Sequence, residues 1–158
     1  MRVTIVPRTD LDQQQIEHLS GRAAAPEHTN DNGPLKAWDQ PANESKLYAV
    51  TVAASPMPIG ILYANLLESE LEVGWWIDIE WRSKKFGRPA VVAFAELLKS
   101  KYPNFMGPIR ARIITFGGRY DDASRALSVE FERHFRKENA SQLALDQTLP
   151  RSRTDQRA

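Results

Sequence analysis

The most constraining feature of this chain is a strand pattern that runs directly into a basic, glycine-containing turn and then into a helix. Residues 70–79 alternate as a β-strand does, and residues 82–88 hold four basic side chains and Gly87. Pro89 then suits the first turn of a helix, where its missing N–H needs no partner. Such a turn can direct several backbone N–H groups at one anion, and the helix dipole adds to the attraction. We therefore expect a phosphorylated ligand to bind there.

The composition describes one folded domain. A chain of 158 residues with 42% hydrophobic residues can bury a core without cross-links. We expect a single domain over residues 1–149 and a disordered tail over residues 150–158. There is no cysteine, and the three histidines lack metal-ligand spacing, so we expect no metal site. No segment approaches membrane-spanning length and residues 1–7 do not resemble a signal peptide, which favours a cytoplasmic protein without membrane contact.

Strand and helix patterns alternate along the chain. We expect strands at residues 1–7, 47–54, 59–67, 70–79 and 109–116, with a further short strand possible at 143–149. We expect helices at residues 11–20, from 89 onward, and at 121–137. Thr9 or Asp10 should cap the first helix and Gly21 should end it. The order indicates a mixed α/β sheet.

The two faces of the strand at residues 70–79 differ in chemistry. One face is entirely apolar and predicts ordinary core. The other carries Glu72 and Asp78 beside Trp76, which predicts a partly open cleft. The long segment at residues 22–46 has no clear periodicity, and a loop of that length is usually functional.

The turn and the order of elements resemble those of the GNAT superfamily of acyl-CoA-dependent N-acyltransferases, in particular the branch that includes the ribosomal-protein N-terminal acetyltransferases. The family's signature is Gln or Arg, two residues, Gly, one residue, then Gly or Ala, and here those positions hold Arg82, Lys85 and Gly87. Residues 121–124 resemble the Asn-x-x-Ser start of the family's last helix. The resemblance covers residues 1–138 in element order and residues 70–98 in motif.

The resemblance implies an α/β (α+β) fold with a mixed, mostly antiparallel central sheet flanked by helices, and with the C-terminal strand pair reduced or absent. It also implies acetyl-CoA, or another acyl-CoA, as the cofactor. The implied contacts with coenzyme A come from Ile77, Ile79, Arg82, Lys84, Lys85, Phe86, Gly87 and Arg88. The strand end would hold the pantetheine arm through its backbone, and the turn would hold the diphosphate.

Acyl transfer to an amine needs a base, because alkyl amines are charged at neutral pH. Glu72 is the first candidate, ahead of Asp78 and Glu70, and an equally simple interpretation is that Glu72 only alternates outward on its strand. The N–H near Ile79 is a candidate oxyanion donor.

Two residues at or just before the start of the last expected helix complete the candidate catalytic set. Ser124 could donate a hydrogen bond to the sulfur of the cofactor, or could simply cap its helix. Tyr120 is a candidate acid, because Ser128 stands where many relatives carry a tyrosine.

Three functions are compatible with these patterns. The first is direct acyl transfer to a primary amine of a small molecule, a lysine or a protein N-terminus. The second is a catalytically weak or inactive module that binds acyl-CoA or a protein. The third is a nucleic-acid-directed protein that uses Arg110, Arg112, Arg119 and Arg125, although a net charge of +1 argues against it. An uncovered sheet edge favours a homodimer.

Overall fold

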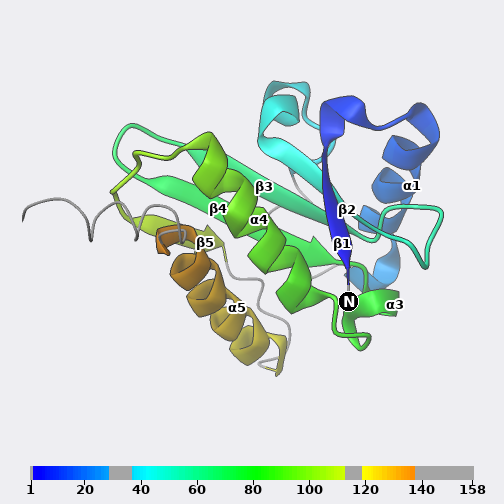
Figure 1. Cartoon of the computed structure of the whole chain (residues 1–158). Coiled ribbons are helices and arrows are strands. Elements are labelled where there is room, and N and C mark those ends of the chain that lie inside the picture. The colour runs from blue at the N-terminus through cyan, green and yellow to red at the C-terminus, as the bar shows by residue number, and fades with distance from the viewer. Residues whose placement is uncertain (1, 29–36, 113–118, 138–158) are drawn as a thin grey trace, which may run out of the picture.

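Five β-strands form one sheet in the computed structural model, which describes residues 2–28, 37–112 and 119–137 (Figure 1). In sheet order they are β1 (Val3–Pro7), β2 (Leu47–Val52), β3 (Gly60–Leu66), β4 (Leu71–Ile77) and β5 (Ile109–Arg112). Strands β1 to β4 pair with one another in antiparallel orientation, whereas β5 runs parallel to β4. The predicted mixed, mostly antiparallel sheet is confirmed.

Tight connections set the register of the central strands. In the turn between β2 and β3, the Ser55 hydroxyl donates to the Met57 carbonyl at 2.7 Å and accepts from the Met57 N–H at 3.2 Å. Gly60 lies at the start of β3, where β3 and β4 approach closely, since a Cβ at residue 60 would lie 2.6 Å from the carbonyl oxygen of Trp76. Between β3 and β4, the N–H of Leu67 donates to the carbonyl of Glu70 at 2.8 Å.

Helices α4 (Gly87–Lys101) and α5 (Arg119–Arg136) cover one face of the sheet (Figure 1). Phe131 of α5 packs 5.9 Å from Trp75 and 6.0 Å from Phe94, measured between ring centroids. The predicted stripe of α4 is fully buried here and consists of Ala90, Val91, Phe94, Ala95 and Leu98. A spacing of three and four residues places these side chains on one side of the helix.

Helix α1 (Gln13–Ala23) covers the other face, and its predicted ends are wrong. Its N-cap is Asp12, which forms a reciprocal capping box with Gln15, while the predicted caps lie in the preceding turn η1 (Arg8–Asp10). Gly21 lies inside the helix and does not end it. The helix ends at Ala23 before Pro26, because a proline disfavours helical backbone in the residue before it.

Three short helical elements complete the described chain: η2 (Pro26–His28), η3 (Pro41–Lys46) and α3 (Ile79–Arg82). The expectations for residues 113–116, for a strand at 143–149 and for a tail at 150–158 lie outside the described residues. None of the helices described is both long and apolar enough to span a bilayer.

Candidate functional site

The site begins where β4 leaves the sheet. The strand ends at Ile77, two residues earlier than predicted, and Ile79 is the first residue of α3. Asp78 makes this change of direction possible: its N–H donates to the carbonyl of Ile59 at 2.8 Å, and its carboxylate accepts from the N–H of Glu80 at 3.1 Å. An aspartate at an N-cap stabilises a helix start in this way, so Asp78 marks both the end of the strand and the start of α3.

The turn that follows has the backbone shape of an anion-binding concavity. Lys85 has a φ of 66°, and Phe86, the N-cap of α4, is right-handed with φ −85° and ψ −12°. Successive residues of opposite hand point their N–H groups to the same side. Among the residues that the structure describes, no acceptor contacts the backbone N–H groups of residues 85–88, which precede and open α4. The Lys84 N–H, in contrast, donates to the carbonyl of Trp81 at 3.1 Å. An anion at the N–H groups of residues 85–88 stays a prediction.

Two side chains hold this turn against the body of the protein. The rings of Trp81 and Phe86 pack with centroids 5.6 Å apart at the edge of the core beneath α4. The ammonium of Lys84 lies 4.9 Å from the Trp81 ring centroid and donates to the carbonyl of Glu80 at 3.2 Å. These contacts of Trp81, Lys84 and Phe86 stabilise the conformation of the turn.

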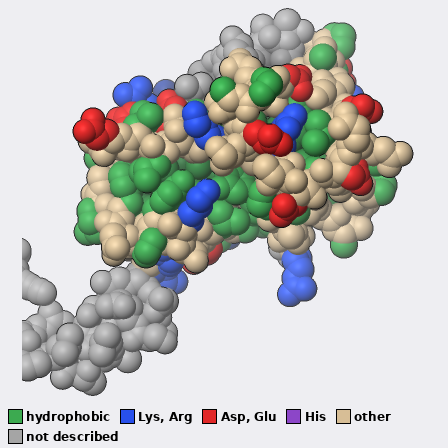
Figure 2. Space-filling model, turned by 90° about the horizontal axis from the view of Figure 1, so that it is seen from above, with side chains coloured by type: hydrophobic (Ala, Val, Ile, Leu, Met, Phe, Trp, Pro, Cys, Tyr) green, Lys and Arg blue, Asp and Glu red, His purple; other side chains and the backbone are tan. Residues whose placement is uncertain are grey.

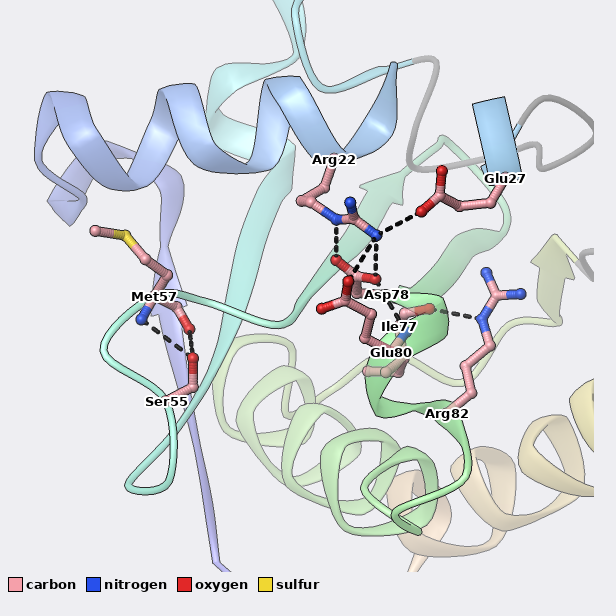
Figure 3. Close-up of polar contacts among 8 residues, drawn as sticks. All are labelled: Arg22, Glu27, Ser55, Met57, Ile77, Asp78, Glu80 and Arg82. Carbon is pink, nitrogen blue, oxygen red and sulfur yellow. Dashed lines mark hydrogen bonds and ion pairs between the residues drawn. The ribbon is translucent and has the colours of Figure 1, made fainter. Parts of the chain in front are cut away.

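The basic side chains of the turn already have local partners. Arg82 donates from Nε to the carbonyl of Ile77 at 2.7 Å, which ties α3 back to the end of β4 (Figure 3). Arg88 donates from Nε to the carboxylate of Glu130 in α5 at 3.3 Å. Lys85 is exposed. An anion at the turn would be attracted by these basic side chains, of which Arg82 and Arg88 are held in position by hydrogen bonds.

An ion-pair cluster that the sequence did not reveal lies beside the turn (Figure 3). Arg22, at the end of α1, donates from Nε and Nη2 to the two carboxylate oxygens of Asp78 at 2.6 and 3.0 Å. It also contacts Glu27 of η2 at 3.2 Å and Glu80 of α3 at 3.8 Å. The hydrogen bond that Arg22 donates to Asp78 raises the pKa of Arg22 above its ordinary value, against the opposing effect of burial. The cluster fixes the end of α1 to the start of α3.

The carboxylate face of β4 is closed, so the predicted open cleft at this face is wrong. Trp76 is 1% exposed, Asp78 3% and Glu72 9%. Trp76 packs in the core beneath α1 together with Trp38 and Tyr63, so these aromatic residues form core here. The reason is tertiary, since α1 and Trp38 pack on Trp76, and Arg22 of α1 binds Asp78, on a face that alternation alone presents to solvent.

The candidate catalytic residues are only partly described. Glu72 lies opposite Asn65 of β3 and Arg110 of β5, on the face of the sheet that α1 covers. Tyr120 and Ser124 both lie in the first turns of α5, but their side chains lie outside the described residues. Among the described residues, no group of three or more His, Asp or Glu side chains is arranged to hold a metal ion.

The sequence matches no protein-family model, and no curated protein is significantly similar to it. The structure, in contrast, is similar to solved acetyltransferases. A spermidine N-acetyltransferase, a SpeG chimera from Vibrio cholerae and hSSAT, superimposes with a TM-score of 0.52 and 13% identity, over 83% of this chain and 80% of its own. The fold of this chain is GNAT-like.

Two further structures have a TM-score of 0.45. They are the Campylobacter jejuni N-acetyltransferase PseH in complex with acetyl coenzyme A, 17% identical, and an aminoglycoside acetyltransferase from an uncultured soil metagenomic sample in complex with sisomicin, 16% identical. Each covers 88% of this chain, and the shares of their own chains covered are 93% and 91%. At these identities the similarity concerns the GNAT-like fold, and the ribosomal-protein branch stays a prediction.

Proposed function

We propose that this chain is an acyl-CoA-dependent N-acyltransferase that uses acetyl-CoA to acylate a primary amine. The observation that carries the proposal is the turn at residues 84–88, whose N–H groups at residues 85–88 contact no acceptor among the described residues. The left-handed Lys85 and right-handed Phe86 form a concavity at the start of α4. In a GNAT-like fold, this donor cluster fits the diphosphate of coenzyme A.

The residues that precede the turn along the chain could contact the remaining parts of the cofactor, in the same order. Ile77 and Ile79 flank the junction between β4 and α3, next to the proposed diphosphate site. Glu72 lies five residues before Ile77 in β4, which is about 17 Å along an extended strand. A ligand that runs from the turn along β4 would therefore bring its far end, and not its diphosphate, toward Glu72.

When bound, acyl-CoA supplies an activated thioester. The amine nitrogen forms a bond to the carbonyl carbon, the carbon–sulfur bond breaks, and the sulfur leaves as thiolate. The acceptor loses two protons in all, one when the ammonium becomes a neutral amine and one as the amide forms. Glu72 would take the first, directly or through water, and one proton goes to the leaving thiolate. Ser124 would donate a hydrogen bond to the sulfur, and Tyr120 is the candidate acid that would protonate the leaving thiolate.

The acceptor that we propose is a small-molecule amine, with a lysine or a protein N-terminus as the other primary amines to test. The fold relative with a TM-score of 0.52 is a spermidine acetyltransferase, so spermidine is the first acceptor to assay. Release of free thiol in the presence of acetyl-CoA and an amine measures turnover. Binding of acetyl-CoA without turnover on any amine would instead support the alternative function as a binding module.

Calorimetry with acetyl-CoA tests the cofactor site itself. Arg88→Gln removes a charge at the turn and should weaken acetyl-CoA binding by about fivefold at low salt. Arg136→Gln is the matched control, because Arg136 pairs with Glu132 of α5 at 2.9 Å and shares no described partner with the residues of the turn. If acetyl-CoA fails to bind, or if both variants lose affinity equally, the proposed site is wrong.

A further inference from the structure

A pocket of about 430 Å³ opens between the C-terminal end of α4 and the turns η1 and η3. Helix α4 has 15 residues, which corresponds to about 22 Å of helix, and the proposed diphosphate turn precedes its other end. The pocket is therefore separate from the turn at residues 84–88. Nothing in the proposed transferase reaction uses it.

Much of the pocket wall is apolar. Pro7 at the end of β1, Leu47 and the ring of Tyr48 at the start of β2, and Leu97 of α4 contribute to it. Figure 2 looks onto this end of the molecule, where hydrophobic side chains gather over a broad area and basic side chains stand among them. The pocket is open to solvent on one side, and its volume lies within the range of sites for small organic ligands.

One ammonium group at the pocket wall has no counter-charge. Lys101 donates from Nζ to the Tyr48 hydroxyl oxygen at 3.1 Å and lies 5.7 and 5.6 Å from the ring centroids of Tyr48 and Tyr102. No carboxylate of the described chain pairs with Lys101. The hydrogen bond with Tyr48 raises the pKa of Lys101 above its ordinary value, against the opposing effect of burial, so the group is charged at neutral pH. An ammonium has three donors, which leaves capacity for an anion.

The other charge at the pocket is already compensated. Glu44 of η3 lines the pocket, but its carboxylate pairs with Nη1 of Arg8 at 3.5 Å. The hydroxyls of Ser45 and Ser100 add neutral donors to the wall. The pocket therefore combines an apolar body with one net positive charge, which complements a ligand with an apolar body and one negative charge.

We propose that this pocket binds a small amphipathic carboxylate. Its apolar part would lie against Pro7, Leu47 and Leu97, and its carboxylate would accept hydrogen bonds from Lys101 and the neighbouring hydroxyls. Charge-assisted hydrogen bonds of this kind are stronger than neutral ones, and the apolar wall favours burial of the rest of the ligand. Such a site, remote from the diphosphate turn, would let a carboxylate bind together with coenzyme A.

Sodium octanoate is the probe for this site, titrated into the full chain in the presence of saturating coenzyme A. We expect octanoate to bind at least tenfold more tightly than octylammonium, with the largest backbone amide shifts at residues 47–48 and 97–101. Equal affinity for the two probes, or shifts centred on residues 84–88, would overturn the proposal. If coenzyme A does not bind, octanoate is titrated without it and the result is judged by the same outcomes. Failure of this pocket to bind a carboxylate is therefore distinguished from failure of the proposed transferase function.

Variants of α4 identify the anchoring charge. Lys101→Met keeps most of the aliphatic stem and should weaken octanoate binding at least tenfold while leaving the affinity for octanol unchanged. Lys99→Met is the matched control, because the Lys99 ammonium contacts the Lys137 carbonyl and Glu96 and does not line the pocket. Ser100→Phe fills the pocket from an exposed position and should abolish binding of octanoate and octanol alike. Full octanoate affinity in Lys101→Met or Ser100→Phe, or an equal loss in Lys99→Met, would contradict the assignment.

Discussion

Lys85 holds a backbone conformation that a lysine adopts at a cost. Its φ of 66° is the only positive value at a non-glycine residue in the described part of the chain. A left-handed residue with a Cβ costs about 1–2 kcal/mol, which glycine avoids. The residue nevertheless keeps the turn that the glycine of the GNAT signature would form. The turn therefore persists despite the substitution, and the lysine adds a positive charge beside the donors.

Lys85→Gly should raise the free energy of unfolding by about 0.5–1 kcal/mol, because relief of the left-handed strain exceeds the extra entropy that glycine loses on folding. Urea unfolding measures the change. Lys85→Ala removes the same charge but keeps the Cβ, so it should not stabilise the protein. Equal stability of the two variants would contradict the strain argument.

Glu72 is the other residue whose predicted role can be tested alone. Glu72→Gln should lower turnover about 100-fold or more, with unchanged affinity for acetyl-CoA, if its carboxylate is the general base. Glu70→Gln is the control, since Glu70 pairs with Arg110 at 3.3 Å and is not the first candidate base. Turnover that survives in Glu72→Gln would leave Glu72 a structural carboxylate of β4.

At the scale of elements, the Arg22–Asp78 pair joins the end of α1 to the junction between β4 and α3. The side chains of Arg22 and Asp78 are 22% and 5% exposed. Removal of one partner from such a pair leaves the other charge in a poorly hydrated place. The pair also links the segment that leads to residues 29–36 with the segment that leads to the proposed diphosphate turn.

Arg22→Met should lower the free energy of unfolding by about 3 kcal/mol, because the Asp78 charge is left without its main partner. Adding Asp78→Asn to Arg22→Met should cost less than the sum of the single changes. Glu80→Gln is the control: Glu80 contacts the same arginine but is 67% exposed, and its loss should cost less than about 0.5 kcal/mol. Additive losses in a thermal unfolding series would argue against coupling between α1 and α3.

A second contact between elements lies where α4 begins. Glu130 of α5 accepts hydrogen bonds from Arg133 and from Arg88, and His134 lies 3.2 Å from its other oxygen. The hydrogen bond from Arg133 is the main cause of a lowered pKa of Glu130, and the bond from Arg88 adds to it. A lowered pKa in the folded state means that the carboxylate stabilises the fold above its ordinary pKa of 4.5 and loses this effect as the pH falls below that value.

Glu130→Gln should therefore lower the melting temperature at pH 7, and the difference from the unmodified chain should shrink as the pH falls below about 4.5. Scanning calorimetry over this range measures it. The same variant should bind acetyl-CoA about twofold to fivefold more tightly, because Arg88 is released toward the proposed diphosphate site. A difference in melting temperature that is constant with pH would mean that the Glu130 charge does not contribute.

At the scale of the whole molecule, β1 and β5 form the two edges of the described sheet. Strand edges with unpaired backbone groups favour association unless another segment covers them. We expect a homodimer, so light scattering should give a mass near twice the 17.9 kDa of one chain. A mass of one chain over a hundredfold range of concentration would contradict this prediction.

Much of the architecture follows from local patterns. The central strands lie within two residues of their predicted ends, and the stripe of α4 is buried as predicted, because alternation and helical spacing operate over a few residues. The capping of α1 was predicted wrongly because Thr9, Asp10 and Asp12 all have side chains that can cap, and only the reciprocal bonds with Gln15 decide among them. Ser124 was placed on the last helix correctly, whereas Tyr120 was expected just before this helix and lies within α5; the catalytic functions of both stay predictions.

The sequence by itself determined the strand, the turn and the helix that together present the N–H groups of residues 85–88, since each of these elements depends on neighbours along the chain. Only the tertiary structure decided that α1 packs on Trp76 of β4, that Arg22 pairs with Asp78, and that Lys101 contacts Tyr48 at a pocket. These contacts join segments about fifty residues apart, so they depend on which surfaces pack together. The periodicity of apolar residues along the chain does not indicate which surfaces pack together.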